Sequence, residues 1–225
     1  MSAPFAVLFD MDGVIFDSER MLRDCWIAIA HREGLEGMEE VYGLCIGVNQ
    51  RASDEILRRA YGEAFPVERF KKEAVGLFRE RIAEQGLPVK PGAREILEEL
   101  KERAVPLALA SSTDQGPVRR ELSEAGLLEF FDVLVTGDMV KNSKPHPEIF
   151  LTAAELLGVK PGDCFVIEDS YNGVRAAAAA GMRPIMVPDL LAPDEEMAAL
   201  AEAILPDLNR AQDLVLRNWC AVRRK

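Results

Sequence analysis

Two aspartates, Asp10 and Asp12, stand two residues apart, and Gly13 follows them directly. The apolar run from Phe5 to Phe9 is too short for a helix and too apolar for an exposed edge, so it predicts a strand buried on both faces. At an effective dielectric of about 20, two carboxylates about 4 Å apart repel by roughly 4 kcal/mol, so a cation is expected beside them. Hard oxygen ligands favour Mg²⁺, which commonly binds one or two carboxylates together with a substrate phosphate. The spacing indicates phosphoryl chemistry, although Asp-x-Asp-Gly alone is also an ordinary turn sequence.

The composition narrows the class of partner. The chain has 225 residues and a formal net charge of -11, which argues against nucleic acid or an anionic membrane because both require a basic surface. No apolar run approaches the roughly 20 residues that cross a bilayer, and the first residues do not resemble a secretory signal, so we expect a cytoplasmic protein. The four cysteines are scattered without a Cys-x-x-Cys pair, so they are expected to be small apolar residues rather than metal ligands.

A helical block follows the first strand. Apolar residues recur with helical spacing from about Leu22 to Ile82, and breaks at 34–37, at 43–47 and near Pro66 predict about four short helices. The segment from Gln85 to Gly92, with two prolines and two glycines, is a plausible return point. We therefore expect a helical domain over residues 16–88, inserted into a core domain formed by 1–15 and 89–225. A hinge at the two connections could close the inserted domain over the acidic turn.

Helices and strands alternate after Pro91. Strands are predicted at 106–110, 133–135, 163–167 and 184–187, the last of them ending the sheet, with helices at 93–103, 117–125, 147–157 and 172–180. This alternation is typical of an α/β fold with a doubly wound parallel sheet and right-handed crossovers.

Polar residues stand at the ends of these strands. Ser111, Asp138 and the pair Glu168-Asp169 follow three of them, and Lys144 lies in the loop before a helix. Ligands of such sheets bind beyond the carboxyl ends of the strands, so we expect these side chains to meet Asp10 and Asp12 in one crevice. Taken singly, a Ser-Thr cluster is more often a helix cap and a lone lysine a surface charge. Asp138 either holds Lys144 or caps the following segment, and the second interpretation is favoured.

The chain resembles the haloacid dehalogenase superfamily, in its phosphatase and phosphomutase branch with a helical cap inserted after the first strand. Four segments carry the resemblance, and their order and spacing span nearly the whole chain: Val7 to Glu19, Ala108 to Thr113, Ser143 to Phe150, and Val166 to Gly173. The resemblance implies a Rossmann-like core, a bound Mg²⁺ and an aspartyl-phosphate intermediate.

Carried over position by position, the resemblance makes Asp10 the nucleophile and Asp12 the general acid and base, which also contacts the metal through its backbone carbonyl. Asp169 matches the remaining metal carboxylate, and Glu168 either ligates the metal or orients a bound water. Ser111 and Lys144 would bind the phosphoryl oxygens and offset the charge of the transition state. Similar dehalogenases and phosphonate-cleaving enzymes lack an acid at the position of Asp12, so cleavage of a phosphate ester is preferred.

The overall layout is similar to β-phosphoglucomutase and the sugar-phosphate phosphatases built like it. The mutase carries a histidine where this chain has Leu22, and its phosphate-binding arginine aligns near Gln50, with Arg51 one residue away. Both departures favour a phosphatase that hydrolyses a small phosphorylated metabolite, with the mutase as the alternative. Ser112, Arg51 and Asn172 are the expected substrate contacts. Arg20, Arg51, Lys71 and Lys72 could bind a polar or anionic part of the substrate, but a charge on a helix of this kind is more often solvated.

Two other classes remain open. A phospho-acceptor signalling module has a similar sheet, Mg²⁺ site and lysine, but the length of the chain and its helical insertion disfavour it. A non-catalytic relative that acts as a binding protein is also disfavoured, because every residue matching a catalytic position is intact. The expected partner is a small-molecule phosphate ester, and the chain is expected to be a monomer or a small homo-oligomer.

Overall fold

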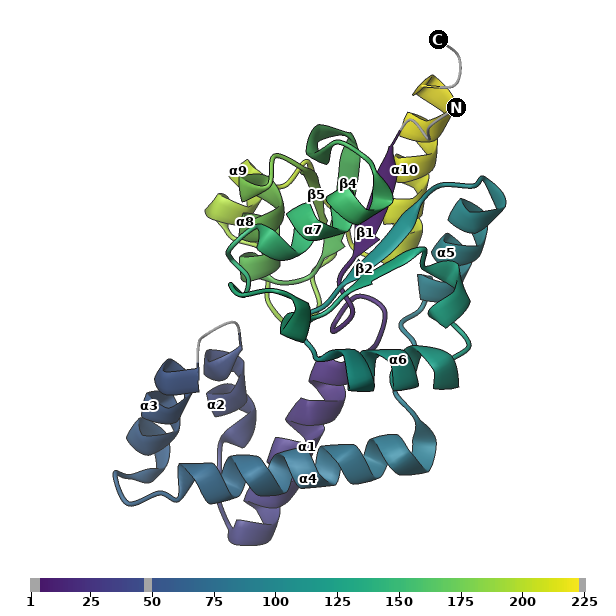
Figure 1. Ribbon diagram of the computed structural model, residues 1–225. Coiled ribbons are helices and arrows are strands. Elements are labelled where there is room, and N and C mark those ends of the chain that lie inside the picture. The colour runs from purple at the N-terminus through teal and green to yellow at the C-terminus, as the bar shows by residue number, and fades with distance from the viewer. Residues whose placement is uncertain (1–4, 47–49, 223–225) are drawn as a thin grey trace. The chain divides into compact units, whose positions relative to one another are not determined.

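A computed structural model describes residues 5–46 and 50–222 of the chain (Figure 1). The chain divides into two compact units, one formed by residues 1–16 and 88–225 and the other by residues 17–87. None of the described helices is long and apolar enough to cross a membrane.

The first unit is built on a six-stranded sheet whose strands are all parallel, in the order β3-β2-β1-β4-β5-β6. The strands are β1 (Ala6–Phe9), β2 (Leu107–Ala110), β3 (Val133–Val135), β4 (Cys164–Glu168), β5 (Arg183–Met186) and β6 (Ala203–Ile204). The chain moves outward from β1 through β2 to β3, then returns to the other side of β1 with β4. This is the doubly wound order, and its switch point lies at the carboxyl ends of β1 and β4.

Helices cover both faces of this sheet (Figure 1). On one face α7 (Glu148–Leu157) and α8 (Tyr171–Ala179) pack on the small side chains of β1, β2 and β4, with Phe150 fully buried among them. On the other face lie α5 (Ala93–Glu102) and α10 (Leu208–Val222), where Trp219 meets the ring of Phe5 edge-on at 5.4 Å. The remaining elements of the unit are α6 (Gln115–Glu124), α9 (Glu195–Leu200) and three short 3₁₀ turns, η1 (Leu128–Phe130), η2 (Gly137–Met139) and η3 (Pro161–Asp163).

The sheet differs from the sequence prediction at its end. The predicted last strand, 184–187, is β5, but the sheet continues with β6, which pairs Ala203 with Ile185 and Ile204 with Met186. The prediction of a last strand was therefore wrong, and α9 and α10 were not predicted. A two-residue strand has no periodicity of its own and exists because a neighbouring strand supplies its hydrogen-bond partners.

The second unit consists of four described helices, α1 (Ser18–Glu33), α2 (Met38–Cys45), α3 (Gln50–Tyr61) and α4 (Val67–Gln85). Three buried aromatic rings meet in its core: the ring of Trp26 meets Tyr42 edge-on at 5.1 Å and Phe70 at 5.3 Å. The breaks at 34–37 and near Pro66 lie where the sequence predicts them. The third break begins later than predicted, because Gly43 lies inside α2, and its residues 47–49 are outside the described part of the chain.

Candidate active site

The loop after β1 carries the two aspartates to the switch point. Asp10 follows the last residue of β1, and its backbone N–H donates to the carbonyl of Ile167 in β4 at 3.0 Å. Gly13 turns the chain with a φ of +81°, and a Cβ atom there would lie 2.1 Å from an oxygen of Asp169. A side chain at position 13 is excluded on both counts, so the glycine lets the β1 loop approach the end of β4.

The side chain of Lys144 forms hydrogen bonds with residues at the ends of three strands. Its Nζ donates to Asp10 Oδ1 at 2.5 Å, to Glu168 Oε1 at 2.6 Å and to the carbonyl of Ala110 at 3.0 Å. The lysine side chain is 7% exposed, and its Nζ lies 4.9 Å from the centre of the Phe150 ring. One ammonium group thus contacts groups at the ends of β1, β2 and β4. The sequence predicts that these strand ends meet in one crevice, but not that the lysine also contacts Glu168 and Ala110.

Glu168 is fixed by its second oxygen. Oε2 accepts hydrogen bonds from the backbone N–H groups of Asp169 and Ser170 at 3.0 Å and from the Ser170 hydroxyl at 2.9 Å. Ser170 Oγ in turn accepts from the N–H of Gly173 and caps α8. A Cβ atom at Gly173 would lie 1.8 Å from the Glu168 carboxyl group, so the carboxylate packs directly against the first turn of α8.

Three carboxylates could hold a metal ion. Asp10, Glu168 and Asp169 each offer an oxygen within 4.8 Å of the others. Hard oxygen donors of this kind suit Mg²⁺, so the residues present fit the expected ion. The carboxylate of Asp12 is not part of this cluster and instead accepts a hydrogen bond from Thr113.

Burial and neighbouring charges shift the pKa values of Asp10 and Lys144. Burial raises the pKa of Asp10 to about 8; Lys144 opposes this rise, and the negative charges of Glu168 and Asp12 add to it. Burial also lowers the pKa of Lys144, but the carboxylates of Asp10 and Glu168 raise it more, so the net shift is upward and the ammonium stays charged at neutral pH. One lysine faces several acids, and this imbalance suits a divalent cation.

The loop after β2 supplies hydroxyl groups. Ser111 is fully buried, and its Oγ accepts from the backbone N–H of Thr113 at 3.1 Å. Thr113 Oγ1 donates to Asp12 Oδ2 at 3.0 Å, a contact that the sequence analysis missed, although the run Ser111-Ser112-Thr113 after a strand was a usable signal. Ser112 is exposed, and its carbonyl packs against Gly137, where a Cβ atom would lie 2.2 Å away.

Asp138 and Asn172 have other partners. Asp138 Oδ1 accepts from the hydroxyl of Thr136 at 2.5 Å and from the backbone N–H of Gln115 at 3.1 Å. Asp138 was predicted to cap the segment that follows it, but the N–H group that it accepts from is that of the first residue of α6, which precedes Asp138 in the chain. Asn172, in the first turn of α8, accepts from Arg175 at 3.3 Å through its side-chain oxygen.

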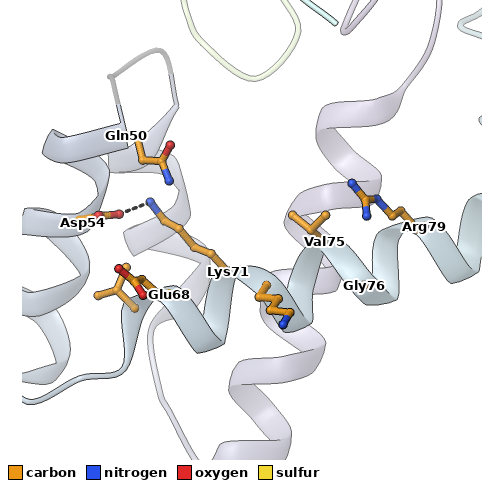
Figure 2. A pocket seen from close by; sticks show the side chains of 9 residues that line it. Gln50, Asp54, Glu68, Lys71, Val75, Gly76 and Arg79 are labelled. Atoms are coloured by element: carbon orange, nitrogen blue, oxygen red, sulfur yellow. Dashed lines mark hydrogen bonds and ion pairs between the residues drawn. The ribbon is translucent and has the colours of Figure 1, made fainter. Parts of the chain in front are cut away.

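Arg51 belongs to the helical unit. Its side chain is 90% exposed and pairs with Glu55 one turn along α3. The neighbouring Gln50 lines a hollow of about 620 Å³ between α3 and α4, and Arg51 does not. Figure 2 shows Lys71 of α4 facing Asp54 of α3 inside this hollow, and the two form an ion pair at 2.5 Å. The charged lining residues are three cations and two acids: Lys71, Lys72, Arg79, Asp54 and Glu68.

Comparison with known proteins places this geometry in a family. The haloacid dehalogenase-like hydrolase family matches residues 6–181. The phosphorylated carbohydrates phosphatase of Thermotoga maritima is 40% identical over 180 residues, which are 80% of this chain and 83% of that protein.

Solved structures agree with this match. A haloacid dehalogenase family hydrolase from Deinococcus radiodurans, with bound phosphate and sodium, has a TM-score of 0.81 at 29% identity and covers 96% of this chain and 97% of that one. The β-phosphoglucomutase of Clostridium difficile, at 24% identity and a TM-score of 0.71 over the full length of both chains, shows the shared fold. The chain therefore belongs to the haloacid dehalogenase-like hydrolases.

Proposed function

We propose that this protein is a Mg²⁺-dependent phosphatase that hydrolyses a small phosphorylated metabolite of the sugar-phosphate kind through an aspartyl phosphate on Asp10. The contact of Asp10 with Lys144 Nζ, beside the cluster that Asp10 forms with Glu168 and Asp169, carries this proposal. The relative from Thermotoga maritima, a phosphatase of phosphorylated carbohydrates, supports the substrate class.

In the first half of the reaction, a carboxylate oxygen of Asp10 attacks phosphorus in line with the departing oxygen. Lys144 and the hydroxyl of Ser111 bind the phosphoryl oxygens, and Asp12 protonates the leaving alcohol. Mg²⁺ bound by Asp10, Asp169 and Glu168, with the backbone carbonyl of Asp12, would neutralise charge on the phosphoryl group.

In the second half, Asp12 is ionised because it has given up its proton. It removes a proton from the water that attacks phosphorus, and the bond between phosphorus and the Asp10 oxygen breaks. Inorganic phosphate leaves, Asp10 is again a carboxylate, and Asp12 again carries the proton that the next cycle needs.

A sugar phosphomutase is the alternative. The mutase must keep water away from the aspartyl phosphate until an intermediate turns over. This chain has Leu22 where the mutase carries its restraining histidine, and the phosphate-binding arginine of the mutase aligns near Gln50, with Arg51 one residue away. Incubation with β-glucose 1-phosphate and its bisphosphate activator separates the two functions. The phosphatase releases inorganic phosphate, whereas isomerised sugar phosphate accumulating faster than phosphate would support the mutase.

The decisive experiment is a panel of sugar phosphates, nucleotides and other small phosphate esters assayed with Mg²⁺. We expect Asp10→Asn to lower turnover of every hydrolysed compound by at least about 10³-fold, as loss of a nucleophile does elsewhere. Asp213→Asn, which changes an exposed acid of α10, serves as the matched control and should keep full activity. Hydrolysis that persists in Asp10→Asn would contradict the proposal.

We further propose that the hollow of the helical unit binds a polar or anionic group of a small ligand. Its cations Lys71, Lys72 and Arg79 suit a polar or anionic group, whereas the exposed pair of Arg51 with Glu55 suits a solvated helix surface. In the same panel, Lys71→Met should raise the KM of the preferred compound more than it lowers kcat. Equal kinetics for Lys71→Met and the native protein would remove this hollow from the proposal.

A further inference from the structure

Thr113 links the loops that follow β1 and β2. Its hydroxyl donates to Oδ2 of Asp12 at 3.0 Å, across 101 residues of sequence. Thr113 is itself held from two sides, because its N–H donates to Ser111 Oγ at 3.1 Å and its carbonyl accepts from the N–H of Gly137 at 3.0 Å. The backbone of Thr113, whose hydroxyl contacts Asp12, is therefore fixed by hydrogen bonds to residues that follow β2 and β3.

The carboxyl group of Asp12 has acidic neighbours. The carboxyl group of Asp10 lies close enough to interact with the charge of Asp12, and so does the buried carboxyl group of Glu121 in α6. The neutral hydroxyl of Thr113 can hold one oxygen of Asp12 in place without adding a positive charge beside these acids.

We infer that Thr113 is a positioning residue for the general acid and base: it fixes Oδ2 of Asp12 so that Oδ1 faces the departing oxygen and later the attacking water. This inference rests on the proposed function. A misplaced catalytic group costs rate although it remains present, because proton transfer requires heavy atoms within about 2.6–3.2 Å of each other. Thr113 would thus act through Asp12 and not on the substrate directly.

The test uses the full chain with Mg²⁺ and compares two leaving groups. Thr113→Val keeps the shape of the side chain and removes its donor. For the preferred sugar phosphate we expect kcat to fall about tenfold, a fraction of the roughly 10²–10⁴ that general acid–base catalysis supplies. For 4-nitrophenyl phosphate, whose leaving group needs little protonation, the pre-steady-state burst of nitrophenol should slow by less than about threefold. Thr113→Ser, which restores the donor, should recover kcat to within about twofold of the native value.

A double-mutant cycle with Asp12→Ala distinguishes positioning from a structural role. If Thr113 acts through Asp12, then Thr113→Val costs no further rate once Asp12 is gone. Thr152→Val, in α7, is the control for the loss of a half-buried hydroxyl, and thermal melts confirm that each variant is folded. Additive losses in the cycle, or equal losses for both leaving groups, would overturn the inference while Asp10→Asn still abolishes hydrolysis. Hydrolysis that survives Asp10→Asn would overturn the proposed function and this inference together.

Discussion

At the scale of single residues, the site depends on close packing as much as on charge. Glu168 is fully buried and accepts four hydrogen bonds, one at Oε1 from Lys144 and three at Oε2 from Asp169 and Ser170. A carboxylate in this environment cannot shift without losing several partners, and buried charges without partners are costly. Glu168 therefore holds Lys144 in place besides being a candidate metal ligand.

Gly173 gives a direct test of this packing. Gly173→Ala would place a Cβ atom 1.8 Å from the Glu168 carboxyl group, so Glu168 or α8 must move. We expect a loss of about 1–3 kcal/mol in the free energy of unfolding, as overpacked sites show, and a fall of at least about tenfold in kcat because Lys144 loses its anchor. Urea unfolding and steady-state kinetics measure the two effects.

Gly116→Ala is the matched control for that substitution. Gly116 lies in α6, and a Cβ atom there would meet nothing within 4 Å, so this variant should keep its activity and be neutral or slightly more stable. If Gly173→Ala behaves like Gly116→Ala, the Glu168 carboxylate is less constrained than we infer.

At the scale of elements, the loop that carries Lys144 is shaped by the first residue of α7. The carboxylate of Glu148 accepts from the backbone N–H groups of Lys141 at 2.8 Å and Asn142 at 3.1 Å, and from the Asn142 side-chain amide at 2.8 Å. An acid at a helix N-terminus is also favoured by the helix dipole. Glu148 thus closes the loop 141–147 onto α7 and sets the point from which Lys144 reaches Asp10.

The hydrogen bonds from Lys141 and Asn142 hold the pKa of Glu148 below its usual range. Because the folded-state pKa is depressed, the stabilisation is present above the unfolded pKa of about 4.3 and is lost as the pH falls through the folded value. We expect the stability difference between the native protein and Glu148→Gln to shrink from pH 6 to pH 3 in urea titrations. Glu148→Ala should also lower kcat at pH 7, because the loop that carries Lys144 loses the hydrogen bonds that Glu148 accepts from Lys141 and Asn142.

Glu155→Gln is the control for this series, since it changes an exposed acid of the same helix. A stability difference for Glu148→Gln that stays constant across this pH range would contradict the assigned role of the charge.

The elements also show how far sequence reasoning reaches. The positions of β1 to β5 could be predicted because each is a short, mostly apolar run between turn signals, and β1 and β2 are fully buried. β6 could not, because two residues carry no period and depend on their pairing with β5. The contact of Thr113 with Asp12 was missed for a related reason. The run Ser111-Ser112-Thr113 marks a polar strand end, but its partner depends on the register of β1 against β2, which pairs Phe9 with Leu109 and which no local pattern encodes.

At the scale of the whole molecule, the two segments that connect the units run side by side within the core unit. Phe16 forms an antiparallel bridge with Val89, and the N–H of Lys90 donates to the carbonyl of Ile15 at 2.9 Å. Lys90 Nζ also pairs at 2.6 Å with Asp189, which follows β5. The helical insertion thus leaves and re-enters the core at one place, beside the loop that bears Asp10 and Asp12.

Because the net charge of the chain is -11, a dissolved metal salt can change the stability of the protein in two ways, by screening surface charges or by binding at a specific site. Any salt weakens the repulsion among so many surface acids, so a rise in stability with MgCl₂ alone would not prove a bound ion. A specific site adds stability through mass action, by about 2.7 kcal/mol when the free ion is 100 times its Kd. Binding to Asp10, Glu168 and Asp169 would be such a site.

We therefore expect MgCl₂ to raise the melting temperature by several degrees more than NaCl does at matched ionic strength, since about 1 kcal/mol corresponds to roughly 2–4 °C for a chain of this size. EDTA should reverse the difference and abolish hydrolysis. Asp169→Asn removes one charge from the cluster and should weaken the Mg²⁺-specific shift, whereas Asp213→Asn removes a surface charge of the same sign and should retain it. Equal shifts with the two salts, or a full Mg²⁺ shift in Asp169→Asn, would mean that the ion acts by screening and that the three carboxylates do not bind it.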